Sequence, residues 1–235
     1  MKNDMQDIEK IESNNASETD SVEHSEKKNK VNKTRKDLHL PRRFFHLFMG
    51  LSAGLIYKHY LTHQQAIHIL GIATCLFYIQ EQVRLKYPEF KSIFSKINGY
   101  LLRAEEQLKE SASMPYLMGM LLTILTFPKY MTLVAVFTLA ISDPLSAVMG
   151  IIFGKTKIKE NRSLEGSSTF FISAFLIHLF VLVDIYPDNN IKLVIVSLLS
   201  STIITAFDLL ELKIDDNFTI PIVTASALWV ITALI

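Results

Sequence analysis

Seven apolar stretches limit what this chain can fold into more than any other feature of its sequence. They cover residues 43–60, 65–83, 113–127, 130–153, 168–186, 191–210 and 219–235. A helix needs about 20 apolar residues to cross a bilayer, and somewhat shorter ones cross where they tilt or where flanking side chains snorkel. We therefore predict an all-α, polytopic membrane helix bundle with about seven transmembrane helices.

The first 40 residues have a different composition. Residues 1–40 are polar and carry many charges of both signs, and no aromatic residue precedes Phe44. Such a segment cannot bury enough apolar surface to offset its ordering entropy. We predict a disordered, charged cytoplasmic tail over residues 1–40 and a transmembrane domain over residues 41–235.

Lysine and arginine placement predicts the orientation. These residues gather before the first apolar stretch and after the second and fourth, whereas the alternate connections hold only Lys58, Lys129 and Lys192. Cytoplasmic connections are the ones enriched in lysine and arginine. We expect a cytoplasmic N-terminus and an outside C-terminus, with the acids and cations of chemical interest on the cytoplasmic side. We favour a bacterial inner membrane over the endoplasmic reticulum.

The long second connection has a helical pattern of its own. Its apolar residues fall near helical spacing among several cations, and they are Ile93, Phe94, Ile97, Tyr100, Leu101 and Leu108. This pattern is typical of an amphipathic helix at a membrane surface. A solvated helix packed on the bundle is an equally good interpretation.

Asp143 is a carboxylate inside the fourth apolar stretch. A charge at the centre of a membrane helix costs about 2.5–3.5 kcal/mol on insertion scales, so such a residue is a functional-site candidate. Ala147, Gly150 and Gly154 follow it at i+4, i+7 and i+11, on the same helical face. Small residues there admit a ligand, although plain helix packing is the alternative. Pro144 lacks an N–H, so we expect a kink or fraying beside the acid.

A basic loop follows this stretch. Gly154, Lys155 and Thr156 resemble the end of a phosphate-binding P-loop, but the glycine spacing is one residue short and the apolar stretch before them is no strand. The loop still gathers cations that could hold phosphates, namely Lys155, Lys157, Lys159 and Arg162. The alternative is ordinary positive-inside topology, which needs no ligand.

Further carboxylates stand near the same predicted membrane face. Glu165 opens the fifth stretch, where it could be a helix-dipole partner or could bind Mg²⁺ jointly with Asp143. Asp208 ends a polar stripe of the sixth stretch, in which we assign the hydroxyls to helix packing. Asp215 and Asp216 lie in the short turn before the last stretch. The only cysteine, Cys75, excludes a disulfide framework and a cysteine-based metal site.

Together, residues 143–155 and 162–167 resemble the CTP-binding signature of the CTP-dependent polyprenol and lipid kinases. That family includes dolichol kinase, CTP-dependent diacylglycerol kinase and phytol kinase, and it is related to phosphatidate cytidylyltransferase. Residues 42–46, 102–106 and 215–221 also fit its kinase branch, so the resemblance spans about 40–235. Arg162 and Ser163 stand where the family usually has lysine and threonine. The C-terminal signature of the cytidylyltransferases is absent, which favours a kinase.

The resemblance implies transfer of the γ-phosphoryl group of CTP to a lipid hydroxyl at the cytoplasmic face, with Mg²⁺ or a similar divalent metal. It implies catalytic roles for Asp143, Glu165, Asp215 and Asp216, of which Asp143 and Glu165 would be metal ligands. The implied nucleotide-binding residues are Gly150, Gly154, Lys155, Lys157, Arg162, Gly166 and Ser167. The implied lipid-binding residues are Arg43, His46, Arg103 and Glu106.

The expected partners are thus CTP and a membrane lipid, and we expect no nucleic acid. The acceptor is a polyprenol or dolichol, a diacylglycerol or a phytol-like alcohol, and the oligomeric state stays open. Two alternatives compete with a kinase. One is a phosphatidate cytidylyltransferase that makes CDP-lipid, and the other is a transporter with Asp143 and Asp208 in a polar path.

Overall fold

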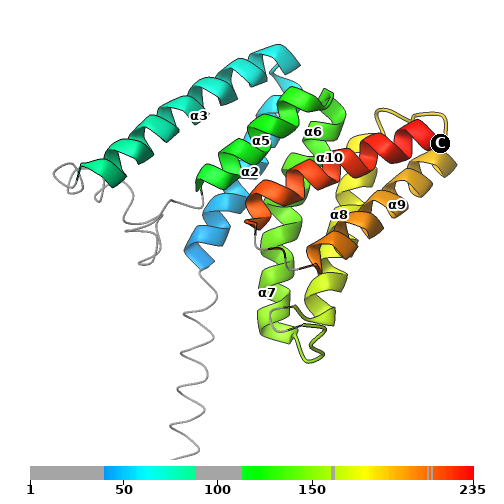
Figure 1. Ribbon diagram of the computed structural model, residues 1–235. Coiled ribbons are helices and arrows are strands. Elements are labelled where there is room, and N and C mark those ends of the chain that lie inside the picture. The colour runs from blue at the N-terminus through cyan, green and yellow to red at the C-terminus, as the bar shows by residue number, and fades with distance from the viewer. Residues whose placement is uncertain (1–39, 88–112, 160–161, 211, 213) are drawn as a thin grey trace, which may run out of the picture. The chain divides into compact units, whose positions relative to one another are not determined.

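Each of the predicted apolar stretches is helical. The computed structural model describes residues 40–87, 113–159, 162–210, 212 and 214–235 (Figure 1). Its helices are α2 (Leu40–His59), α3 (His63–Lys86), α5 (Ser113–Thr126), α6 (Lys129–Phe137), the π-helix η3 (Thr138–Ser142), α7 (Asp143–Phe153), α8 (Leu164–Leu182), α9 (Asn190–Asp208) and α10 (Asp216–Leu234). Over these residues the only β-type pairing is an isolated bridge between Lys157 and Ser163. The all-α prediction is confirmed.

Five of these helices are long and apolar enough to cross a membrane. They are α3, the continuous Lys129–Phe153 helix formed by α6, η3 and α7, and then α8, α9 and α10. The outer faces of α8 and α9 expose large apolar side chains, Leu176 and Ile203 among them, as lipid-facing helices do. The chain is therefore an integral membrane protein. A crossing by α5, which is shorter, or by α2 stays a prediction.

Two predicted regions lie outside the described residues. One is the charged tail, and the other is the amphipathic segment around residues 93–108 together with Arg103 and Glu106. Residues Pro41–Ile235 form one compact unit, and the site is built within it.

The helices pack in an order that brings distant parts of the sequence together. In Figure 1, α8 lies between α7 and α9, while α10 runs across α5, α6 and α9; close contacts join each of these pairs. A buried apolar cluster that includes Leu139, Phe170 and Ile204 lies beneath the site. Leu139 and Ile204 each stand one helical turn before an acid, Asp143 and Asp208 respectively. This cluster fixes the depth of both carboxylates.

The opposite end of the bundle is held by the lysines of the alternate connections. Lys58 forms an ion pair with Asp184 at 3.0 Å. The Nζ of Lys129 donates hydrogen bonds to the carbonyls of Leu61 at 2.7 Å and Lys58 at 3.2 Å. These contacts join the α2–α3 turn to the start of α6 and the end of α8. Lys58 and Lys129 therefore stabilise this end of the bundle. The candidate site lies at the opposite end, where α7 ends and α8 begins.

Candidate functional site

The helix widens into a π-helical turn just before Asp143. The N–H of Asp143 donates to the carbonyl of Thr138, five residues back, and α7 then begins with Asp143 and Pro144. Single π-turns inside helices often mark functional sites. We had predicted a kink or fraying at Pro144; the structure has a wider turn in its place. Asp143 is neither fully buried nor fully exposed.

A cluster of opposite charges surrounds this acid. The Nη2 atom of Arg162 lies 2.9 Å from an oxygen of Asp208 and 2.9 Å from an oxygen of Asp216. Asp143 interacts electrostatically with these three residues and with Arg43. Only 2% of the Asp208 side chain is exposed, and a buried carboxylate needs a compensating cation. Arg162 thus joins the end of α9 to the start of α10, beside Asp143.

Arg162 makes both ion pairs with only one of the nitrogen atoms of its guanidinium. A guanidinium carries five N–H donors, and both ion pairs involve the same nitrogen, Nη2. The side chain is 18% exposed. Arg162 can therefore hold both carboxylates and still donate to a phosphate.

Arg43 reaches the cluster because α2 comes close to η3. Gly50 stands two helical turns after Arg43 on the same face, and a Cβ there would lie 2.5 Å from the Cβ of Ala140. Only glycine allows this approach of the two backbones. His46, predicted to bind lipid, lies one turn from Arg43, and its ring packs edge-on against Tyr116 at 5.4 Å between centroids.

The three glycines of the predicted nucleotide motif form a tight seam between α7 and α8. A Cβ on Gly150 would lie 3.1 Å from the Ser163 hydroxyl, and one on Gly154 would lie 2.7 Å from it. A Cβ on Gly166 would lie 3.0 Å from the Ser146 carbonyl oxygen. The same Ser163 hydroxyl caps α8 by accepting the N–H of Gly166 at 3.2 Å. The packing interpretation of these glycines therefore holds, and contact with a nucleotide stays a prediction.

Glu165 organises the basic loop. Its two carboxylate oxygens lie 3.2 and 3.4 Å from the backbone nitrogen of Thr156, which donates to them. The Thr156 carbonyl accepts the N–H of Leu164 at 2.8 Å, so the loop is fixed on both sides. Lys155 and Lys157, on either side of Thr156, are exposed.

Asp143 and Glu165 have different contacts, and a metal ion shared by the two stays a prediction. Asp143 interacts electrostatically with Asp208, Asp216, Arg43 and Arg162, whereas the carboxylate of Glu165 accepts the N–H of Thr156. The structure therefore brings Asp143 together with the acids of α9 and α10. Asp208 was not among the predicted catalytic residues, although it carries the signal that identified Asp143, a carboxylate in an apolar run.

Asp215 and Asp216 play different structural parts. Asp215 caps α10 through its Oδ1 atom, which accepts the backbone N–H of Asn217 at 2.9 Å and its side-chain N–H at 2.7 Å. Asp216 belongs to the charged cluster through Arg162. We predict both acids in a turn before the last helix; the structure places only Asp215 before it, because α10 already begins at Asp216.

The residues around Asp143 suit a magnesium–nucleotide complex better than a metal ion alone. Within the described ranges, no three histidine, cysteine or acidic side chains converge as a metal site would need. Magnesium in nucleotide sites takes one or two carboxylates and completes its shell with phosphate oxygens and water. The hydroxyls of Ser142 and Ser167 are buried and find no hydrogen-bond partner in the described part of the chain. The site thus offers a carboxylate and polar groups that a ligand could use.

Three of the known proteins that are similar to this chain in sequence have the same description. The chain is 28% identical over 134 residues to the CTP-dependent diacylglycerol kinase 1 of Saccharomyces cerevisiae, covering 56% of this chain and 46% of that protein. It is 25% identical to the protein of the same name from Eremothecium gossypii, over 57% of this chain and 43% of the relative. It is also 25% identical to the protein of the same name from Schizosaccharomyces pombe, over 58% of this chain and 64% of that protein.

The chain spans about half the length of these relatives. No protein-family model matches it, and no solved structure does. The chain is thus an integral membrane protein with an acid–arginine cluster at one end of its bundle. It is similar in sequence to proteins named as CTP-dependent lipid kinases.

Proposed function

We propose that this protein transfers the γ-phosphoryl group of CTP to the hydroxyl of a membrane lipid at the cytoplasmic face. The observation that carries the proposal is its similarity to three proteins named CTP-dependent diacylglycerol kinase. The charged cluster around Asp143 supports it, because phosphoryl transfer asks mainly for positioning and for neutralisation of charge. Diacylglycerol is the first acceptor to test, ahead of polyprenol and phytol.

In this proposal the triphosphate lies between the basic loop and the charged cluster. Arg162 and Arg43 would contact it from the bundle, and Lys155 and Lys157 would contact it from the loop. Asp143 would hold Mg²⁺, which supplies further neutralisation of the phosphate oxygens when it is bound. We had expected Glu165 to share this ion. We now assign Glu165 to holding the loop, because its carboxylate already accepts the N–H of Thr156.

The reaction is a single displacement. The lipid hydroxyl oxygen bonds to the γ-phosphorus, the bond from that phosphorus to the β,γ-bridging oxygen breaks, and CDP leaves. The hydroxyl proton passes to a carboxylate at the start of α10, Asp215 or Asp216. Acyl or prenyl chains stay in the bilayer throughout, which explains why such an enzyme is built from apolar helices.

Purified protein in lipid vesicles tests this function. With diacylglycerol and CTP labelled at the γ-phosphorus, we expect labelled phosphatidate and an equal amount of CDP. Polyprenol and phytol, assayed in parallel, identify the preferred acceptor.

The same assay separates the alternatives. A cytidylyltransferase would use phosphatidate, release pyrophosphate and move an α-phosphorus label into lipid. A transporter would label no lipid, and CTP would not change its thermal stability. Either result would contradict the proposal.

A further inference from the structure

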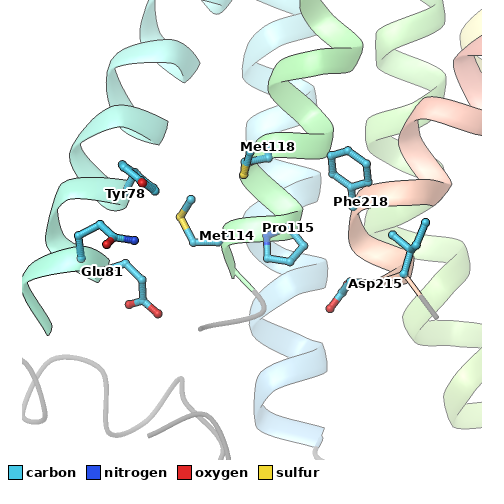
Figure 2. Close-up of a pocket in the computed structure, with 9 residues that line it drawn as sticks. Tyr78, Glu81, Met114, Pro115, Met118, Asp215 and Phe218 are labelled. Carbon is cyan, nitrogen blue, oxygen red and sulfur yellow. The ribbon is translucent and has the colours of Figure 1, made fainter. Parts of the chain in front are cut away.

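A second feature of the molecule, a pocket of about 320 Å³, opens between α3, α5 and α10. Figure 2 shows Tyr78 and Glu81 of α3 on one side of α5, and Asp215 and Phe218 of α10 on the other. Met114 and Met118 of α5 lie between them. The sequence did not indicate this pocket.

The lining of the pocket is mostly apolar and includes two acidic residues. Side chains of methionine, phenylalanine and tyrosine make up much of the wall, and Tyr78 and Met118 are about half exposed, at 52% and 50%. Glu81 and Asp215 are the charged residues of the described lining. A wall of this kind accepts a molecule with an apolar body and a polar head.

Asp215, one of the two acids, determines which charge that head can carry. Glu81 is buried and is paired with Arg84, whose guanidinium donates to it at 2.8 and 2.6 Å. Asp215 uses Oδ1 for its two bonds to Asn217, and Oδ2 takes part in neither. Because Arg84 neutralises Glu81, the net negative charge of the described lining comes from Asp215, and its carboxylate would repel a phosphate head. An uncharged hydroxyl head can donate a hydrogen bond to Asp215 instead.

The pocket also stands beside the candidate nucleotide site. Asp215 lines the pocket, and the next residue, Asp216, is bound to Arg162 at 2.9 Å. A hydroxyl at Asp215 is therefore next to the charged cluster that would hold the γ-phosphate. Tyr78 of α3 and Met118 of α5, which line the pocket, are each about half exposed, so the pocket is open beside these two helices.

We infer that this pocket holds the head of the acceptor and selects an uncharged lipid with a free hydroxyl, such as diacylglycerol, over a lipid phosphate. Its chains pass between α3 and α5, and Asp215 contacts the reacting hydroxyl. The inference rests on the proposed function and deepens it by naming where the acceptor binds and why its head is neutral.

A bulky substitution in the wall tests the inference. Met118→Trp fills the pocket without touching the charged cluster, and Ile203→Trp, on the exposed face of α9, is the matched control. In mixed micelles we expect Met118→Trp to raise the KM for diacylglycerol at least tenfold. The KM for CTP and the thermal stabilisation by CTP should change less than twofold. Ile203→Trp should match the wild-type protein in both KM values and in the thermal stabilisation by CTP.

A change of charge tests the selectivity. Gln82→Lys places a cation in the lining. We expect phosphatidate to inhibit this variant at least fivefold more strongly than the wild-type protein, with the CTP response unchanged. Equal inhibition of the two proteins would overturn the electrostatic part of the inference.

The two proposals fail differently. If wild-type protein phosphorylates no lipid from CTP, the proposed function is wrong. If it does, and Met118→Trp leaves the KM for diacylglycerol unchanged, the pocket is not the acceptor site. Photocrosslinking with a diazirine-bearing diacylglycerol gives a readout without turnover. The inference requires label on the peptide that contains Met114 and Met118, and label on other helices alone would overturn it.

Discussion

The Nη2 atom of Arg162 lies 2.9 Å from a carboxylate oxygen of Asp216, a residue 54 positions further along the chain. The same nitrogen is 2.9 Å from Asp208. Arg162 thereby fastens the loop between α7 and α8 to the end of α9 and the start of α10, and Asp143 interacts electrostatically with all three residues. This arrangement makes several consequences measurable.

Removing Arg162 should destabilise the bundle as well as the site. Arg162→Ala leaves the carboxylate of Asp208 buried without its cation, which costs about 3–5 kcal/mol. Thermal unfolding in detergent should show a clear loss of stability, and Asp188→Ala, in the exposed α8–α9 connection, should show little. Adding Asp208→Asn to Arg162→Ala should restore part of the stability, because the uncompensated charge is gone. No recovery in the double variant would show that the ion pair does not carry the effect.

Two glycines provide a matched pair. Gly154→Ala would place a methyl group against the Gly150 carbonyl oxygen and 2.7 Å from the Ser163 hydroxyl, whereas Gly71→Ala meets nothing closer than 3.9 Å, at Leu121. Overpacking of this kind costs about 1–3 kcal/mol. We expect Gly154→Ala to lower the unfolding temperature and Gly71→Ala to leave it within the error of the measurement. If the two variants had the same unfolding temperature, the α7–α8 contact would have room for a methyl group at Gly154, which would contradict the close packing described above.

Asp143→Asn should remove activity and keep the fold. The substitution preserves the shape of the side chain and removes the charge that would hold the metal–triphosphate complex. We expect kcat to fall by about 10² or more, within the range that one electrostatic contact at a reacting phosphate supplies. Asp188→Asn, in the exposed α8–α9 connection, is the control. A wild-type rate for Asp143→Asn in purified protein would exclude the metal role.

Glu165→Gln should affect the loop and leave the metal requirement unchanged. The amide keeps one oxygen to accept the Thr156 N–H but loses the charge-assisted bond. We expect a several-fold higher KM for CTP and the same Mg²⁺ dependence as in the wild-type protein. A raised Mg²⁺ requirement, measured by titrating the metal at saturating CTP, would return Glu165 to the role of ligand that we first predicted.

Orientation can be measured with cysteine labelling. Cys75 is the only cysteine of the sequence, so Cys75→Ala gives a cysteine-free protein into which one cysteine at a time can be introduced. We expect Lys157→Cys to react with a membrane-impermeant maleimide only from the cytoplasmic side and Asp188→Cys only from the outside. The reverse pattern would put the candidate site on the side without CTP and would contradict the proposed function.

The sequence located the helices closely. The predicted stretch 130–153 became Lys129–Phe153, and 191–210 became Asn190–Asp208. Apolar length is a local property, and a helix satisfies its own backbone in lipid, so no tertiary contact is needed to define it. The largest shift is at α8, which begins four residues before its predicted start at 168 because Ser163 caps it there. The sequence also identified Asp143 as exceptional, since a charge within such a stretch is rare.

Tertiary structure decided which groups act together. Helical periodicity places Asp143 on a face of its own helix, but it does not say which neighbour that face meets. From the sequence we predict Glu165, which opens the next apolar stretch, as the partner of Asp143. α7 packs on α8, α8 packs on α9, and Arg162 lies between Asp208 and Asp216, so Asp143 interacts electrostatically with acids far along the chain. The pocket of α3, α5 and α10 arose in the same way, because its wall exists only where three separate helices meet.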